Sequence, residues 1–223
     1  MVANGLMGGF YRLSEWVMRL AYVNILWMIF TLLGAIVLGI GPATAGMFAV
    51  IRKMVMGDDD ISVFKIFWST YRKEFKRANI LTFLVVILGF ILYFDSRFFQ
   101  SQEGMFFYLL RYFTLGLFIM YLLVLFYIFP LFAHYQMKIL HYLRSALLFA
   151  FMQPIITILM VAGNYVVYRI LMAIPGLIPF FGVSLFSFIT MYLAYISFKR
   201  VELREENKEK QQEAKVEEGM NHN

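Results

Sequence analysis

The sequence contains no cysteine and few charged residues, and each shortage excludes a set of functions. Without cysteine the chain has no disulfide, no thiol nucleophile and no thiolate metal site. Charged residues make up 15% of the 223 residues, compared with roughly 25% in soluble domains. Apolar residues make up 61%, and the stretch from Leu20 to Val50 carries no charge, although about 20 apolar residues suffice for a membrane-spanning helix. The composition therefore predicts an all-α, polytopic membrane protein.

Sequence motifs for catalysis are missing as well. There is no phosphate-binding G-x-x-x-x-G-K-[ST] loop, no H-E-x-x-H and no serine or threonine in a nucleophile elbow. His134 and His141 lie seven residues apart without a neighbouring cysteine or carboxylate, which makes a poor metal site. We interpret Asp95 and Arg97 as a surface ion pair and not as part of a catalytic dyad. We therefore predict no enzymatic activity, no cofactor and no bound metal.

Five apolar runs predict five membrane spans. The first is interpreted as a retained span, because no signal-peptide pattern precedes it. The predicted spans cover about residues 20–38, 80–94, 112–130, 146–168 and 176–198. Each is close to the length that a ~30 Å hydrocarbon core requires. Residues 1–198 then form one membrane domain, and residues 199–223 form a charged, disordered tail.

The distribution of lysine and arginine predicts the orientation in the membrane. The predicted cytoplasmic loop 52–78 holds seven of these residues, the loop after the third span holds two and the tail holds six. The opposite side holds five, which are Arg12, Arg19, Arg97, Arg111 and Arg169. The positive-inside rule then places the C-terminus in the cytoplasm and, with five spans, the N-terminus outside. An extra partial crossing near the start would bring the N-terminus inside.

The stretch LGIGPATAGMFAVIRK, residues 38–53, predicts a turn followed by a short helix. Glycines end the first span, proline suits the first turn of a new helix, and small residues four apart permit close helix packing. The new helix has about 14 residues and covers only ~21 Å, so we expect a re-entrant or interfacial helix. The stretch is either a plain turn between two packed helices, or a conformational hinge or partner-docking elbow. The candidate packing elbow consists of Gly41, Pro42, Ala45, Gly46 and Ala49.

The next segment predicts a basic amphipathic helix on the cytoplasmic side. Aromatic residues recur at three- and four-residue spacing between Phe64 and Phe75, with basic residues between them, a pattern typical of a helix at the membrane interface. The helix either packs under the bundle among anionic headgroups or docks a cytoplasmic partner. We expect no nucleic-acid partner, because the basic residues are scattered over several loops. The candidate lipid or partner surface consists of Lys65, Trp68, Arg72, Lys73, Lys76 and Arg77.

The predicted spans contain amides and no central carboxylate, whereas transporters usually carry ionisable groups within their spans. Gln153-Pro154 and the segment from Pro175 to Pro179 interrupt the helical pattern. Such breaks either line a substrate site or form kinks, in which neighbouring helices bond the freed backbone groups. The candidate intramembrane polar contacts are Asn24, Gln153 and Asn164.

Three segments, YVNILWMIFTLLG, GPATAGMFAVIRK and FWSTYRKEFKRANIL, resemble the YesL family of integral membrane proteins of Gram-positive bacteria. The resemblance is close in the first half of the chain and extends to the remainder through the arrangement of spans. It implies a helical protein of five or six spans in the bacterial cell membrane. It also implies a gene context of carbohydrate uptake and polysaccharide degradation, and it supplies no catalytic residues.

Three functions follow as hypotheses. The first is a non-enzymatic accessory or regulatory component of a sugar importer, whose subunits and anionic lipids would be its partners. The second is a transporter of small polar solutes such as sugars. The third is a lipid-directed enzyme at the cytoplasmic face, for which the sequence offers no motif. The oligomeric state does not follow from the sequence.

Overall fold

The computed structural model describes residues 6–58 and 60–221, and these residues form helices and connecting loops without any strand. This confirms the predicted all-α fold. Four helices are long and apolar enough to cross a membrane, and a bent pair near the C-terminus provides a fifth crossing if it is one span. The elements are α1 (Leu6–Leu33), α2 (Ile40–Met56), α3 (Val63–Lys73), α4 (Phe75–Gln100), α5 (Met105–His134), α6 (Ile139–Met152), α7 (Pro154–Ala173), η1 (Pro175–Leu177), α8 (Ile178–Phe181) and α9 (Ser184–Asn221).

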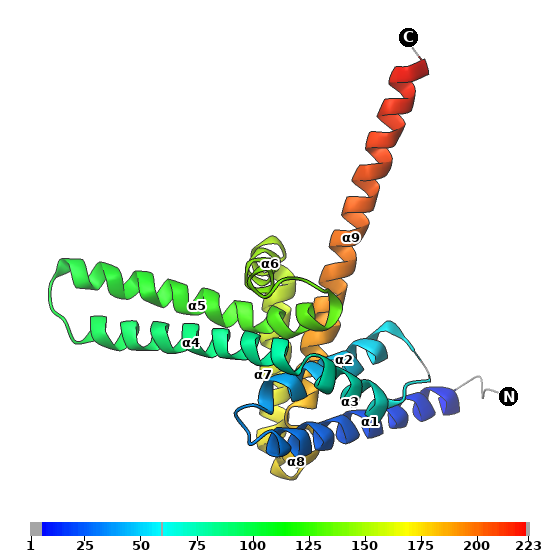
Figure 1. The fold of residues 1–223 in the computed structure, drawn as a ribbon, viewed down its shortest axis with the longest axis horizontal. Coiled ribbons are helices and arrows are strands. Elements are labelled where there is room, and N and C mark those ends of the chain that lie inside the picture. The colour runs from blue at the N-terminus through cyan, green and yellow to red at the C-terminus, as the bar shows by residue number, and fades with distance from the viewer. Residues whose placement is uncertain (1–5, 59, 222–223) are drawn as a thin grey trace.

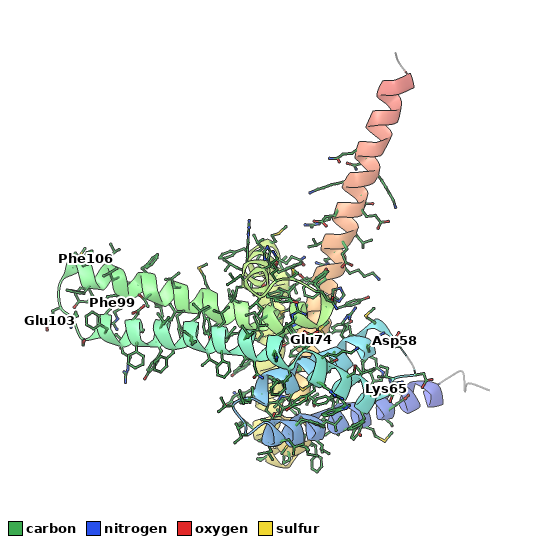
Figure 2. All side chains as sticks on the ribbon, in the orientation of Figure 1. Asp58, Lys65, Glu74, Phe99, Glu103 and Phe106 are labelled. Carbon is green, nitrogen blue, oxygen red and sulfur yellow. The ribbon has the colours of Figure 1, made fainter. Side chains whose placement is uncertain are left out.

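Two features project from the central group of helices (Figure 1). Helices α4 and α5 form a long hairpin, and the last part of α9 extends alone in another direction. Glu103 lies at the far end of the hairpin near Phe99 and Phe106, whereas Glu74 lies at its base (Figure 2). The far half of the hairpin exposes large apolar side chains such as Phe90 and Leu109, as a lipid-facing surface does.

Helix α2 is buried and returns along α1. The Trp27 indole N–H donates to Thr44 Oγ1 at 3.0 Å, and Val50 and Ile51 are fully buried. Helix α2 contacts α1, α3, α4, α5 and α9, so it is a central element. Of the two predicted alternatives, the re-entrant helix fits this position and the interfacial helix does not.

The return of α2 also bears on the predicted side of the N-terminus. Antiparallel pairing puts Arg19, in α1, at the same end of the pair as Arg52, near the end of α2. The two arginines therefore lie at one end of this helix pair, whereas the count with five spans predicted them on opposite sides of the membrane. Helix α2 is suited to be the partial crossing that would bring the N-terminus inside, and the side of the N-terminus stays a prediction.

The predicted amphipathic helix is divided at Glu74, which has φ −95° and ψ 8°. Residues up to Lys73 belong to α3, and Lys76 and Arg77 belong to α4. The aromatic stripe is divided too, because Phe67 and Tyr71 are buried whereas Phe64 and Trp68 are exposed. The rings of Phe67 and Tyr71 lie 5.3 Å and 5.0 Å from that of Phe30 in α1. Half of the stripe is therefore core, and this favours the interpretation in which α3 packs under the bundle.

The predicted fourth and fifth spans both contain breaks. Gln153 leaves the helical region, with φ −131° and ψ 64°, because Pro154 restricts the residue before it. Residues 146–152 therefore belong to α6, and the fourth span is α7. The segment predicted as the fifth span comprises η1, α8 and the start of α9, with a 61° bend between the parts.

The tail predicted to be disordered continues α9 as a helix to Asn221. It is rich in glutamate, lysine and glutamine, which favour helix in the absence of packing. Glu206 and Lys210 add an ion pair one turn apart, with Oε1 and Nζ 3.1 Å from each other. Local propensity therefore carries the helix beyond the bundle.

Candidate functional site

The base of the α4–α5 hairpin meets α2 and α9 in a polar cluster, which we call the basic junction. Arg52 donates from Nη1 to the carbonyl oxygen of Ala133 at 3.1 Å, which satisfies a carbonyl in the last turn of α5. A cation is favoured there because the helix dipole is negative at that end. The basic junction consists of Arg52, His134, Tyr135 and Glu202.

Glu202 ties α9 to the end of α5. Its Oε1 accepts a hydrogen bond from the Tyr135 hydroxyl at 2.7 Å and lies 3.6 Å from His134 Nε2. Burial, and then the adjacent Glu202, raise the pKa of the Tyr135 phenol above its usual value, so the phenol stays a donor at neutral pH. The contact joins residues 67 positions apart.

The basic junction also contains polar atoms without a partner. Arg52 Nε and His134 Nδ1 are buried and make no hydrogen bond within the described part of the chain. The His134 side chain is 10% exposed. These atoms leave unused hydrogen-bonding capacity beside α9.

A segment of extended chain links α5 to α6 and is held in place by one tyrosine. The Tyr142 hydroxyl donates to the carbonyl oxygen of Tyr135 at 2.8 Å and accepts from the Met137 N–H at 3.0 Å. Arg77 Nη2 donates to the carbonyl oxygen of Met137 at 2.8 Å. An open groove of about 760 Å³ lies beside this segment. Its lining residues, which define the basic groove, are Arg77, Gln136, Met137, Lys138, Ile139, Leu140 and His141.

The residues of the candidate packing elbow lie where α2 passes closest to its neighbours. A Cβ added at Gly41 would lie 2.6 Å from Thr82 Oγ1, and one added at Gly46 would lie 3.1 Å from the carbonyl oxygen of Phe67. Glycine therefore lets the backbones of α4 and α3 approach α2. Pro42 and Ala45 are buried and Ala49 is half-buried, so the elbow is a packing surface.

Asn24 fastens α1 to the break between α8 and α9. Its Nδ2 donates to the carbonyl oxygen of Pro179 at 2.7 Å, and its Oδ1 accepts from the N–H groups of Val183 and Ser184, each at 3.0 Å. The side chain is 1% exposed. It thus satisfies backbone donors that the start of a helix leaves free.

The other two predicted amides link α7 to α9. Gln153 Nε2 donates to the carbonyl oxygen of Ser197 at 2.9 Å. Asn164 Nδ2 donates to Thr190 Oγ1 at 3.0 Å, and its Oδ1 is buried without a partner within the described residues. Each of the three amides therefore bonds another element, as polar residues between membrane helices do.

The predicted lipid or partner surface is mostly exposed. Trp68 is 41% exposed, whereas Arg77 is half-buried and donates from Nη1 to Glu74 Oε2 at 3.0 Å. Arg77 thus belongs with the basic groove. The remaining exposed cations, which we call the basic face, are Lys65, Arg72 and Lys73 of α3 and Lys76 of α4.

Sequence reasoning missed the contact of His134 and Tyr135 with Glu202. His134 was considered only as a metal ligand, and no group of three or more His, Cys, Asp or Glu suited to a metal occurs in the part of the chain that the structure describes. No local spacing connects residue 135 to residue 202. One signal was available in the sequence: a long apolar run ends at His134 and Tyr135. A tyrosine hydroxyl at such a place needs a polar partner.

Comparison with known proteins identifies the family. The family model described as "Protein of unknown function, DUF624" matches residues 20–96. The uncharacterized protein YteU of Bacillus subtilis strain 168 is 38% identical over 199 residues, 89% of each chain. From the same organism, the uncharacterized protein YesV is 38% identical over 86% of this chain and 92% of its own. The uncharacterized protein YesL, also from this organism, is 36% identical over 92% of this chain and 95% of its own.

No solved structure matches this chain. The similarity to the three Bacillus subtilis proteins extends over most of this chain and over most of each of theirs. The family model covers most of α1, together with α2, α3 and most of α4. The chain therefore belongs to the YesL family, represented by the DUF624 model.

Proposed function

We propose that this protein is a non-enzymatic membrane protein that assists or regulates a carbohydrate importer by binding its subunits on the cytoplasmic side. The observation that carries the proposal is the single helix of α9, which leaves the bundle at the basic junction and extends beyond it (Figure 1). A helix of about 23 residues beyond Phe198 reaches about 35 Å. It presents both charge signs, which suits a polar protein surface. The carbohydrate context comes from the family resemblance.

The basic face supports the same proposal. The side chains of Lys65, Arg72 and Lys73 are exposed and form no hydrogen bond or ion pair within the described residues, so they are available to an acidic partner or to anionic lipid. They lie on α3, which is anchored to α1 by the rings of Phe67 and Tyr71. The face is therefore presented by a helix that is fixed to the core, which reduces the ordering cost of binding.

A sugar transporter is the second candidate, and the breaks at Gln153 and at Gly182–Val183 favour it. Broken helices expose backbone groups that bind substrates in some transporters. Here, however, Asn24 bonds the backbone at one break and Gln153 bonds Ser197 at the other. These groups are already occupied by helix contacts, so the geometry favours the accessory function.

The test is capture of partners from native membranes. The full chain would be tagged, cross-linked in cells growing on polysaccharide and purified, and captured proteins would be quantified by mass spectrometry. We expect the natural sequence to capture an importer subunit. The variant with Lys65, Arg72 and Lys73 all changed to Gln should capture several-fold less of that subunit. A matched control changes Arg97 and Arg111, near the far end of the hairpin, to Gln.

Two outcomes contradict the accessory function. One is capture of no importer subunit by the natural sequence, whereas equal capture by all variants would exclude only the basic face as the contact surface. The other is uptake of labelled sugar into liposomes that contain only the purified protein, which would establish the transporter instead.

A further inference from the structure

We propose that the basic groove is a binding site for one anionic phospholipid. This site differs from the basic face and does not depend on the proposed function. The groove lies between the start of α4 and the segment that joins α5 to α6. It combines cationic and apolar walls in one open hollow, and this combination matches a lipid with a phosphate headgroup and acyl chains.

The cationic wall is partly preorganised by Arg77. Its guanidinium contacts Glu74 Oε2 at 3.0 Å and the carbonyl oxygen of Met137 at 2.8 Å, and lies 5.8 Å from the centre of the Phe132 ring. These contacts fix the group and use two of its five N–H donors, so others stay available to phosphate oxygens. Lys138 and His141 are exposed on the same groove.

The apolar wall distinguishes a lipid from a free phosphate ion. Met137, Ile139 and Leu140 line the groove together with the basic residues, and Leu140 is 69% exposed. An inorganic anion gains nothing from such a wall, whereas an acyl chain buries apolar area against it. The groove is open, so a lipid could occupy it while its chains extend into the bilayer.

The shape of the groove is set before a ligand arrives. Tyr142 is 1% exposed, and its hydroxyl bonds the backbone on both sides of Gln136. Arg77 holds the same segment through Met137. A loop fixed at these points loses little conformational entropy on binding.

The test measures lipid binding by the purified full chain in detergent, by native mass spectrometry with short-chain phosphatidylglycerol. The variant changes Lys138 and His141 to Gln; both side chains are exposed, and K138Q alone serves if the double variant does not fold. The control changes Lys65 and Lys73 to Gln and removes two basic residues from the basic face. We expect the groove variant to bind phosphatidylglycerol about tenfold more weakly, because a lysine charge and a polar ring beside the anionic headgroup are lost. The control should bind within about twofold of the natural chain.

A second pair of measurements separates a lipid from its phosphate. Leu140→Ser should weaken binding of phosphatidylglycerol several-fold, and phosphatidylcholine and inorganic phosphate should each bind the natural chain more weakly than phosphatidylglycerol. The proposal is overturned if phosphate binds as tightly as the lipid, or if the groove variant and the control lose affinity equally. Unchanged binding in the groove variant would also overturn it.

Discussion

Arg52 Nη1 lies 3.1 Å from the carbonyl oxygen of Ala133 and thereby connects the end of α2 with the end of α5. The two residues are 81 positions apart. This bond closes the base of the hairpin onto the buried helix, and it lies next to the contact of Tyr135 with Glu202. The central helix, the hairpin and α9 are thus held at one place.

Replacing Arg52 with Ala should destabilise the protein by about 1–3 kcal/mol, because a charge-assisted bond to the end of a helix is lost. The measurement is the thermal unfolding midpoint of the purified protein in detergent. Arg72→Ala is the control, since Arg72 is exposed on α3, and its stability should change by less than about 0.5 kcal/mol. Equal midpoints for the two variants would show that the bond contributes nothing.

Gly46→Ala should destabilise the protein, although alanine is the better helix former. The new Cβ would lie 3.1 Å from the carbonyl oxygen of Phe67, so α3 must shift, at a cost of about 1–3 kcal/mol. Gly116→Ala is the matched control in α5, where an added Cβ meets nothing within 4 Å. The yield and unfolding midpoint should fall for the first variant and not for the second. A stabilised Gly46→Ala variant would disprove the tight contact.

Asn24→Ala should cost about 1–3 kcal/mol, because the N–H groups of Val183 and Ser184 would lose their acceptor in a buried position. Asn79→Ala is the control, since the Asn79 amide donates to Phe75 within its own helix. Unfolding midpoints in detergent compare the two, and hydrogen exchange at the start of α9 should rise only in the first. Equal exchange in both variants would remove the proposed role of Asn24.

We predict that both termini face the cytoplasm and that the hairpin tip faces outside. The return of α2 along α1 joins Arg12 and Arg19 to the basic side, which then holds seventeen of the twenty lysines and arginines. A cytoplasm-active reporter should work at either end of the chain. Because the chain has no cysteine, Ser101→Cys should react with an impermeant thiol reagent in whole cells, and Lys65→Cys should not. Labelling of Lys65→Cys alone would invert the topology.

The sequence predicted the helices well because apolar runs in the membrane leave the backbone no other way to satisfy its hydrogen bonds. It predicted the helix limits less well. The apolar run continues through Gln153, so hydropathy did not separate α6 from α7. The aromatic spacing continues past Glu74, so periodicity did not separate α3 from α4. In both places a single residue leaves the helical conformation, and average hydrophobicity does not record such a change.

The candidate site was predicted in part. Small residues at four-residue spacing indicated close packing around Ala45 and Gly46, and the structure places both against neighbouring helices. The basic junction was not predicted, because Arg52, Tyr135 and Glu202 are distant in sequence and meet only after three helices pack. Contacts of this kind depend on tertiary arrangement and leave no periodic pattern in the chain.

Glu202 divides α9 into an inner arm within the bundle and an outer arm beyond it, and the two arms are nearly equal in length. About 27 Å of helix separates Ser184, where Asn24 holds it, from Glu202, where Tyr135 holds it. About 28 Å more continues to Asn221. The inner arm is also held by Gln153 at Ser197 and by Asn164 at Thr190, so a sideways push on the outer arm should bend α9 near Glu202 and leave the inner arm in place. Spin labels should then show displacement of the outer arm alone, and opposite displacements of the two arms would exclude this.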